Sequence, residues 1–525
     1  MLSADPPGAP RLRRAPIAPA RLAASALSGA MFFLASPKWD LWPLGWIAVV
    51  PLLWAMRGQT PRRAALYAWV AGLVTHGGGF YWIVGLLQRF GHFPLALALP
   101  VYSLLAAYQA LVFAAFGWSY ARVRAGTSLP AALVAPVAMV AFELVMPFLF
   151  PCYLAISQAW VLPIIQIADV TGPLGVTFLM FLAGGALWDV IERGGAAWRP
   201  AIAAAATIVL ALGYGAFRIR QVDARRAAAP KRTVGSVQAN VGISEKGSVA
   251  LAGRHHALHL ELTRELERRG ADLVVWPESS YPYFYWRHMR QDWPVSDPRR
   301  LMTDLRTPVL FGAVTFGRGA PHPYNSALLA RPDGTLDGPY DKNMLLLFGE
   351  YVPLYDELDI KRWIPASSNF ARGADTRLFE IGGMRIGPMI CYEDIIPSFA
   401  RRLVALRPNL LVNLTNDAWF GATSEPWQHL ALAVFRSVEA RLDLVRSVNT
   451  GVTAFIDATG RVRQKIRSVD PQAEPDVAPM TLLGEVALME PGSVYASVGD
   501  VFGWLALAAL AAMLWRSRRA TASGA

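Results

Sequence analysis

The chain has 525 residues, of which 54% are hydrophobic and 17% are charged, and its formal net charge at pH 7 is +12. The composition is too apolar for an ordinary soluble protein, and the length is too great for a single domain. A basic chain can bind nucleic acid, but many of these arginines flank apolar segments, so we expect a membrane protein with no nucleic-acid partner. Two cysteines, Cys152 and Cys391, are too few for a disulfide framework, and we expect both to be free.

Apolar segments dominate the first 217 residues. A helix needs roughly 20 apolar residues to cross a bilayer. We expect eight spans, the first two short, at 22–36, 41–56, 64–87, 94–119, 128–149, 171–190, 199–217 and 499–515. The predicted organisation is a tail at 1–21, a transmembrane domain of about seven helices at 22–217, a linker at 218–231, a soluble domain at 232–497, a last span at 498–516 and a tail at 517–525.

Arginines mark alternate loops between these spans. Short loops rich in Lys and Arg remain in the cytoplasm. The tails and loops that we place inside contain Arg11, Arg13, Arg14, Arg21, Arg57, Arg62, Arg63, Arg122, Arg124, Arg193, Arg199, Arg516, Arg518 and Arg519. Both tails are therefore predicted to be cytoplasmic, with the soluble domain on the outer side.

Two features do not fit this simple scheme. A basic cluster would lie outside, and it either binds anionic headgroups or belongs to a solvated linker; its members are Arg218, Arg220, Arg225, Arg226, Lys231 and Arg232. Glu143 lies within an expected span, where a carboxylate marks a functional site or a hydrogen bond between helices. We favour the hydrogen bond.

The region 232–497 alternates strand-like and helical patterns. Short apolar runs predict strands at 234–241, 272–276, 308–315, 384–391, 409–415 and 452–457. Helices are predicted at 255–269 and 428–443, and hairpin turns at 332–334 and 458–460. This alternation is typical of an α/β domain.

Three reactive side chains follow strand-like or loop segments of this domain. Glu278 ends Trp276-Pro277-Glu278, Lys342 ends Tyr340-Asp341-Lys342, and Cys391 ends an apolar run. A thiol needs a base to ionise, and a carboxylate can serve as that base. An ammonium can then stabilise an oxyanion. The residues alone leave two interpretations open, because a cysteine at a strand end is also a common packing residue.

Four short sequence motifs favour the catalytic interpretation of Cys391. They are the segments 275–278, 348–353, 390–393 and 416–421. They resemble the nitrilase superfamily and, more narrowly, its membrane branch, the apolipoprotein N-acyltransferase family. The resemblance implies helical spans carrying an extracytoplasmic α/β nitrilase-like domain, an α-β-β-α sandwich. It also implies that Cys391 is the nucleophile, Glu278 the base and Lys342 the oxyanion stabiliser, with Glu350, Tyr392 and Glu393 in support. Structural ion pairing is the alternative for Glu350 and Glu393.

The same resemblance implies the reaction and its location. An acyl chain would pass from a phospholipid, through a thioester on Cys391, to the amine of a diacylglyceryl apolipoprotein, with membrane lipid around the enzyme. The enzyme would be a multi-pass monomer of the bacterial inner membrane with a periplasmic catalytic domain. One segment departs from the family pattern, because 244–248 contains no tryptophan where members often have one.

Other interpretations remain open. The chain could be a membrane-tethered amidase that hydrolyses small amides, or a non-catalytic membrane scaffold. The aromatic run 281–286 could be a lid, an arm that enters the bilayer surface or ordinary packing. We expect no cofactor and no metal, since His255, His256 and His259 fit a solvated helix and His429 fits a structural role.

Overall fold

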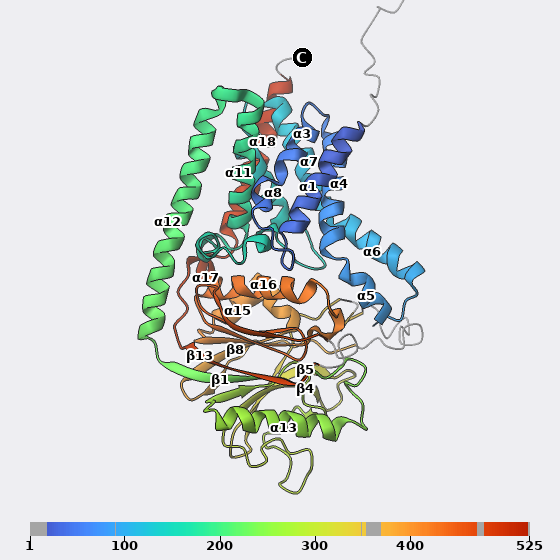
Figure 1. Ribbon diagram of the computed structural model, residues 1–525, viewed down its shortest axis with the longest axis vertical. Helices are drawn as coiled ribbons and strands as arrows, with labels where there is room; N and C mark the ends of the chain where they lie inside the picture. The colour runs from blue at the N-terminus through green and yellow to red at the C-terminus, as the bar shows by residue number, and fades with distance from the viewer. Residues whose placement is uncertain (1–17, 90, 348, 353–368, 470–476, 523–525) are drawn as a thin grey trace, which may run out of the picture.

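The computed structural model describes residues 18–522, apart from 90, 348, 353–368 and 470–476. Figure 1 shows a bundle of helices above two stacked sheets, with the long helix α12 running beside both parts. The expected cytoplasmic charges Arg11, Arg13 and Arg14 lie outside the described residues.

The N-terminal part is helical throughout, as expected. Its elements are α1 (Pro19–Ala35), α2 (Leu44–Ile47), α3 (Val49–Met56), α4 (Pro61–Gly79), α5 (Trp82–Arg89), α6 (Leu95–Gln109), α7 (Leu111–Gly126), α8 (Ala131–Val145), η1 (Leu154–Gln158), α9 (Leu162–Ile165), α10 (Ala168–Thr171), α11 (Leu174–Arg193), η2 (Gly194–Ala197) and α12 (Trp198–Ala228). The C-terminal helix α18 (Val501–Ala522) packs against α7 and α8. Together they form an apolar helical region with candidate membrane spans.

Fewer helices reach full span length than the sequence predicts. Within the described ranges, Leu95–Gly126 and Leu174–Ala228 are long and apolar enough, and a bent pair, Pro61–Gly79 with Trp82–Arg89, makes a possible third. The bend between α4 and α5 is 53°. The bend comes directly after Gly77, Gly78 and Gly79. Consecutive glycines weaken a helix, which explains why it breaks at this point. From this break, α5 and α6 project sideways out of the bundle (Figure 1).

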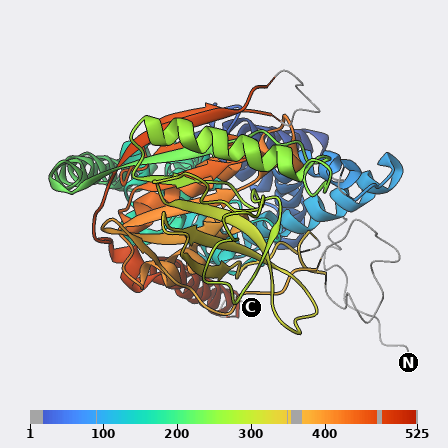
Figure 2. The same cartoon turned by 90° about the horizontal axis from the view of Figure 1, so that it is seen from below.

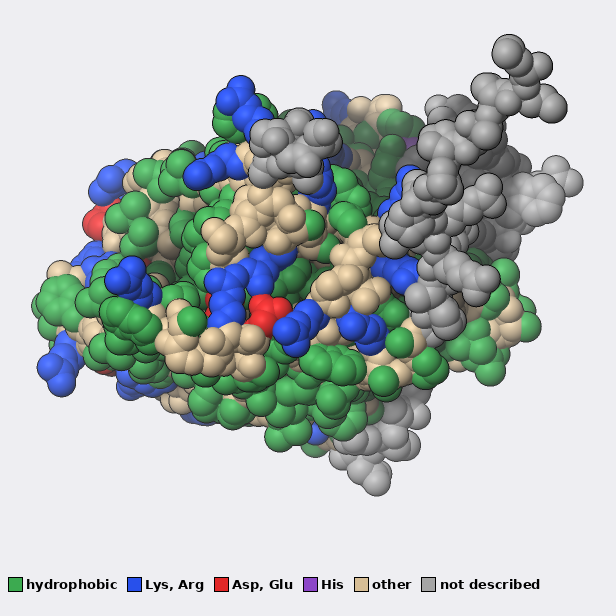
Figure 3. Space-filling view, turned by 90° about the horizontal axis from the view of Figure 1, so that it is seen from above, with side chains coloured by type: hydrophobic (Ala, Val, Ile, Leu, Met, Phe, Trp, Pro, Cys, Tyr) green, Lys and Arg blue, Asp and Glu red, His purple; other side chains and the backbone are tan. Residues whose placement is uncertain are grey.

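Basic side chains gather at the end of the bundle farthest from the sheets. The α3–α4, α7–α8 and α11–α12 connections lie at this end, together with the C-terminal end of α18 (Figure 1). Figure 3 looks onto this end and shows many Lys and Arg side chains among apolar ones, with few acidic groups. The loops expected on one side of the membrane therefore share one end of the helical part.

Two buried carboxylates serve the helical part structurally. Asp189 of α11 accepts hydrogen bonds from the first main-chain amides of α8, at 3.0 Å from Ala131 and 2.9 Å from Ala132. These amides have no partner within their own helix, and a carboxylate there also opposes the positive end of the helix dipole. Glu143 Oε1 accepts from the main-chain nitrogen of Leu154 at 2.9 Å. The hydrogen bond between helices that we favoured is thus present, between α8 and the short helix η1.

The expected linker 218–231 is largely helical, since α12 continues to Ala228 and the first strand starts at Lys231. Its arginines bind other parts of the protein. Arg218 pairs with Asp169 at 2.7 Å, and Arg226 pairs with Asp443 at 2.7 Å. Neither headgroup binding nor a solvated linker describes these two side chains.

The soluble part contains two mixed sheets. The first consists of β1 (Lys231–Gln238), β2 (Leu273–Val275), β3 (Phe284–Trp286), β4 (Val309–Phe316), β5 (Tyr324–Ala330), β6 (Leu336–Asp341) and β13 (Met480–Ala487), in the order β13-β1-β2-β4-β5-β6 with β3 on β4. The second consists of β7 (Phe379–Ile381), β8 (Met384–Ile390), β9 (Leu410–Thr415), β10 (Leu444–Val448), β11 (Val452–Ile456) and β12 (Val462–Arg467), in the order β12-β11-β10-β9-β8-β7. All six strands predicted from the sequence are present.

Helices cover the outer face of each sheet. α13 (Ala252–Arg268) lies on the first sheet, and α15 (Pro397–Val404) and α16 (Glu425–Ala440) lie on the second, between that sheet and the bundle (Figure 1). Figure 2, from below, shows α13 crossing the sheet and the light-blue α6 extending beyond the soluble part. The short helix α17 (Val494–Val498) leads into α18. The predicted α-β-β-α sandwich is confirmed.

The central strands are buried on both faces, which explains their continuous apolar runs. Val234 and Leu273 of the first sheet share one core with Ile386 and Leu411 of the second. A second core lies between the first sheet and α13 and includes Trp276.

The histidines of α13 correct one expectation from the sequence. His255, His256 and His259 are buried rather than solvated. The His259 ring lies 4.8 Å from that of Trp276, and burial lowers the pKa of His259 to about 4. A helical pattern shows which residues share a face, but the aromatic cover over this face comes from distant segments.

Candidate active site

The three predicted catalytic side chains come from the ends of three strands. Glu278 follows β2, Lys342 follows β6 and Cys391 follows β8. The β2 and β8 ends belong to parallel pairs, where α/β sheets place ligand sites. Lys342 Nζ lies 3.2 Å from Glu278 Oε1 and 2.7 Å from Glu350 Oε2. The structure thus brings Glu278, Lys342 and Glu350 together around one buried ammonium.

Asn325 is a fourth member that sequence reasoning missed. Its Nδ2 donates to Glu278 Oε1 at 2.7 Å and to Glu350 Oε1 at 3.0 Å. It lies in β5, whose other residues are mostly apolar, so a polar side chain in a buried strand was the available signal. By binding both carboxylates, Asn325 holds them on either side of Lys342.

Lys342 remains a charged ammonium in this environment. Burial lowers its pKa, but Glu278 and Glu350 raise the pKa more strongly, so the net value lies well above the usual range. A fixed ammonium near a reacting carbonyl stabilises the negative charge that forms on its oxygen.

Cys391 occupies a sharp turn directly after β8. It is the first residue of η3 (Cys391–Ile395), and its φ of +50° is uncommon for a residue other than glycine. The turn is held by Asn413, whose Nδ2 donates to the main-chain oxygen of Cys391 at 3.1 Å. Burial, with the charge of Glu278, raises the pKa of the thiol well above its usual range, although Lys342 opposes this. The resting thiol is therefore protonated and needs a base.

Glu393 connects the lysine loop to the cysteine turn. Its Oε1 accepts from the main-chain nitrogen of Asn343 at 2.6 Å, and its Oε2 accepts from Ile390 N at 2.8 Å and Tyr340 Oη at 2.6 Å. Burial raises the pKa of Glu393 to about 7, against the lowering effect of these donors. These donors are a neutral hydroxyl and main-chain amides, so Glu393 sets the distance between two reactive segments through hydrogen bonds rather than ion pairing.

Tyr392 joins the active-site turn to the helical part. Its hydroxyl donates to the main-chain oxygen of Leu149 at 2.8 Å. The next residue, Phe150, packs on Trp82 of α5 with ring centroids 5.4 Å apart. Trp82 packs in turn on Phe420 at 5.0 Å, in the Asn-Asp-Ala-Trp-Phe-Gly string. The site therefore lies where the soluble part meets the broken helix α4–α5.

A buried charge network lies beneath the cysteine turn. His429 Nε2 is 2.7 Å from Asp394 Oδ1, and its Nδ1 is 3.2 Å from Asp417 Oδ1. Arg446 binds both aspartates, at 2.9 Å and 2.8 Å. Asp417, Glu425 and His429 are close enough to share a metal ion.

The chemistry of this cluster favours an ion network. Burial and Arg446 lower the pKa of His429, but Asp394 and Asp417 raise it more, to about 10. An imidazole protonated on both nitrogens donates hydrogen bonds and offers no lone pair to a metal, and Arg446 and protonated His429 together balance the charges of Asp394 and Asp417. The expected structural role for His429 fits these contacts.

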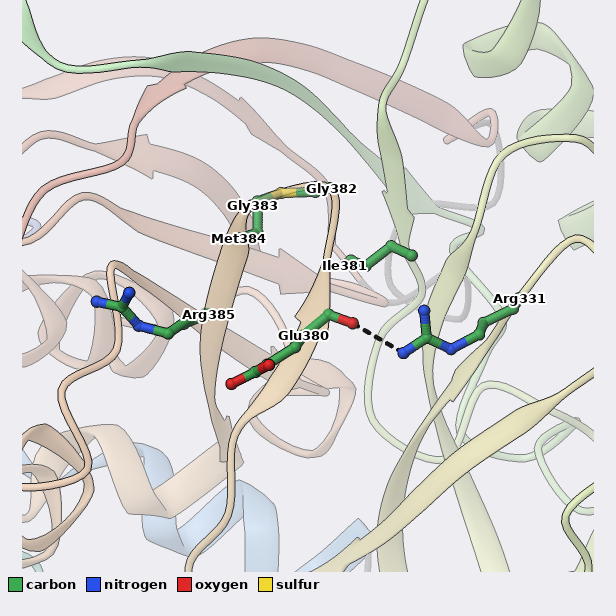
Figure 4. Close-up of a pocket in the computed structure, with 7 residues that line it drawn as sticks. All are labelled: Arg331, Glu380, Ile381, Gly382, Gly383, Met384 and Arg385. Atoms are coloured by element: carbon green, nitrogen blue, oxygen red, sulfur yellow. Dashed lines mark hydrogen bonds between the residues drawn. The ribbon is translucent and has the colours of Figure 1, made fainter.

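A surface hollow of about 370 Å³ lies elsewhere, at the β7–β8 hairpin (Figure 4). Arg331 donates there to the main-chain oxygen of Glu380 at 2.8 Å. The hollow adjoins the start of β8, whereas Cys391 follows its end, about 20 Å away for a strand of this length. It takes no part in the cysteine chemistry.

The remaining predicted features have mixed outcomes. Within the aromatic run, Tyr281 and Tyr285 are buried and stacked 4.7 Å apart, whereas Phe284 and Trp286 are exposed. Core packing thus explains the two buried tyrosines and the partly buried Tyr283, which packs against the same core. Both cysteines are free. Two residues of the Phe-Gly-Glu-Tyr-Val-Pro string, Phe348 and Pro353, lie outside the described residues.

Comparison with known proteins matches both parts of the chain. Residues 28–186 match the apolipoprotein N-acyltransferase N-terminal domain, and residues 233–469 match the carbon-nitrogen hydrolase family. The apolipoprotein N-acyltransferase of Geobacter metallireducens is 36% identical over 504 residues, covering 92% of this chain and 93% of its own. That of Pseudomonas syringae pv. tomato is 30% identical, covering 92% of this chain and 96% of its own.

Solved structures match about half of the chain. The NitN amidase from Neterenkonia sp. AN1 is 17% identical, covers 52% of this chain and 97% of its own, and has a TM-score of 0.36. Saccharomyces cerevisiae Nit3 is 15% identical, covers 49% of this chain and 90% of its own, and also has a TM-score of 0.36.

Proposed function

Since the chain belongs to the apolipoprotein N-acyltransferase family, we propose that it moves an acyl chain from a phospholipid to the N-terminal amine of a diacylglyceryl apolipoprotein, through a thioester on Cys391. It is a membrane protein with several apolar helices and an acyltransferase of the nitrilase superfamily. We also propose a role for each residue of the site in this reaction.

The observation that carries the mechanism is the buried ammonium of Lys342, fixed by Glu278 and Glu350 beside the Cys391 turn. Asn325 and Glu393 hold these groups through hydrogen bonds that are present without substrate. Groups already in place need no reorganisation when charge develops, which is the main source of electrostatic catalysis.

The first half-reaction forms the acyl-enzyme. Glu278 takes the proton of Cys391, and the thiolate attacks the sn-1 ester carbonyl of the phospholipid. Lys342 stabilises the oxyanion that forms. The carbon–oxygen bond then breaks, and the leaving alkoxide of the lysophospholipid takes from Glu278 the proton that came from Cys391, which leaves a thioester and an ionised base.

The second half-reaction transfers the acyl chain. The amine of the acceptor attacks the thioester carbonyl, the carbon–sulfur bond breaks, and the chain becomes an amide. Glu278 takes a proton from the attacking nitrogen and returns one to Cys391. The thiolate is a good leaving group, so the amine displaces it readily, and the enzyme returns to its starting state.

The position of the site suits substrates that remain in lipid. Tyr392 and Trp82 connect the cysteine turn with the helices, so acyl chains can stay beside the apolar bundle during transfer. Holding both substrates at this boundary converts an encounter in solution into an oriented reaction. We place the basic end of the bundle in the cytoplasm and the catalytic domain in the periplasm of the bacterial inner membrane, with the enzyme acting as a monomer.

Acylation of a synthetic diacylglyceryl peptide tests the function. Purified protein in phospholipid-containing micelles should raise the peptide mass by one acyl chain, linked as an amide that resists hydroxylamine. A peptide with an acetylated N-terminus is the control and should stay unchanged. Hydrolysis of small amides without any acylated peptide would instead support a nitrilase-type amidase.

A further inference from the structure

Lys246 contacts the candidate active site and is not one of the three predicted catalytic residues. It lies on a turn between β1 and α13, inside the segment 244–248 that lacks the family's tryptophan. Its Nζ donates a hydrogen bond of 2.9 Å to the main-chain oxygen of Glu278. The turn is compact, because the main-chain nitrogen of Lys246 donates to Gly242 O at 3.0 Å.

The turn that carries Glu278 has little room to move. Ser279 next to it has a φ of +45°. The turn packs against Gly312 of β4 so closely that a Cβ there would lie 2.5 Å from both Pro277 O and Ser279 N. Glu278 is the residue between these two, and its main-chain oxygen accepts the hydrogen bond from Lys246. This bond fixes the main chain of Glu278.

The charges of the site do not balance without Lys246. Glu278 and Glu350 carry two negative charges, and Lys342 carries one positive charge. An excess charge in a buried site is costly and favours the protonated form of a carboxylate. Lys246 lies within electrostatic reach, because burial lowers its pKa to about 8 while Glu278 and Cys391 oppose that shift. A second ammonium makes the cluster neutral.

We propose that Lys246 is a positioning residue of this site, which holds the main chain of Glu278 and balances the excess negative charge of the Glu278–Lys342–Glu350 cluster. The inference rests on the proposed function, since it assigns Lys246 a part in the thioester step. Without the charge of Lys246, the cluster would keep an excess negative charge, which disfavours the ionised carboxylate that the thioester step needs.

The test is the pH profile of single-turnover thioester formation from phospholipid in Lys246→Gln, Lys246→Met and Lys246→Arg. In both neutral variants the acid limb should move to higher pH. Each pKa unit of that shift lowers the rate about tenfold at pH values on the limb. Lys246→Gln keeps a donor for Glu278 O and should therefore keep a higher maximal rate than Lys246→Met.

The arginine variant separates charge from general structural damage. Lys246→Arg should leave the acid limb at the wild-type position. We also expect the wild-type rate to decline as Lys246 loses its proton, since burial lowers the pKa of Lys246 to about 8, and Lys246→Arg should remove that decline. Lys465→Met, at an exposed lysine of β12 over the Trp427 ring, is the matched control and should behave as wild type.

Three outcomes decide the matter. The inference is supported if the acid limb of the pH profile moves to higher pH in Lys246→Gln and Lys246→Met and stays at the wild-type position in Lys246→Arg. It is overturned if the acid limb stays in place in neutral variants that keep the wild-type Tm, even if their maximal rate falls. If wild type itself forms no thioester, the proposed function fails, which is a different result.

Discussion

Replacing Glu278 with glutamine should slow thioester formation by on the order of 10²–10⁴-fold, the usual loss when a general base is removed. The amide cannot accept the proton of Cys391. The thiol cannot ionise unaided, because burial and nearby carboxylates hold its pKa well above the usual range. Rapid-quench measurement of acyl-enzyme formation, with phospholipid in excess, gives the rate directly.

Glu350→Gln is the matched control for this loss. Both substitutions remove one carboxylate that binds Lys342 and Asn325, but only Glu278→Gln removes the base. We therefore expect Glu350→Gln to lose less activity than Glu278→Gln. Equal rates in the two variants would mean that the loss comes from a misplaced Lys342, and a wild-type rate in Glu278→Gln would remove Glu278 from the mechanism.

Replacing Asp169 with asparagine should destabilise the junction between the helical and soluble parts by about 3–5 kcal/mol, the range for breaking one side of a buried ion pair. Asp169 Oδ2 lies 2.7 Å from Arg441 and 2.7 Å from Arg218, and both Asp169 and Arg441 are fully buried. Tyr214 also donates to Asp169 at 2.6 Å. The substitution leaves two guanidinium groups without their negative charge.

The measurement is the unfolding midpoint in detergent micelles, followed by light scattering and by limited proteolysis near the end of α12. Asp223→Asn provides the comparison, since Asp223 pairs with Arg461 at 3.3 Å on the surface and should change stability by less than about 1 kcal/mol. Equal midpoints for the two variants would show that the Asp169 cluster contributes no more than a surface pair.

The residues that we propose as catalytic could be picked out from the sequence because each ends a short motif or an apolar run. Cys391 comes directly after β8, and Glu278 lies three residues after β2. The strands themselves are apolar since both faces are covered, which makes them easy to find. By contrast, β12 is the edge strand of its sheet and has a polar sequence, because four of its six residues are exposed Arg, Gln or Lys.

The contacts that complete the site depend on distant segments. The sequence marks Asn325 only as a polar residue in a buried strand, and it marks Lys246 only as part of a turn. Their contacts follow from where β5 and the β1–α13 turn lie beside Glu278. The same holds for Arg441, which meets Asp169 across 272 residues of chain. A charged residue can be recognised in the sequence, but the residue that it pairs with is determined by the tertiary fold.

The most direct test of the account is the intact mass of the purified enzyme after incubation with phospholipid and no acceptor, beside Cys391→Ser. We predict that wild type alone gains one acyl chain, that hydroxylamine removes it, and that a diacylglyceryl peptide discharges it as an amide. A folded wild-type enzyme that acylates the peptide without ever carrying this mass, or a Cys391→Ser variant that acylates it equally well, would contradict the thioester mechanism.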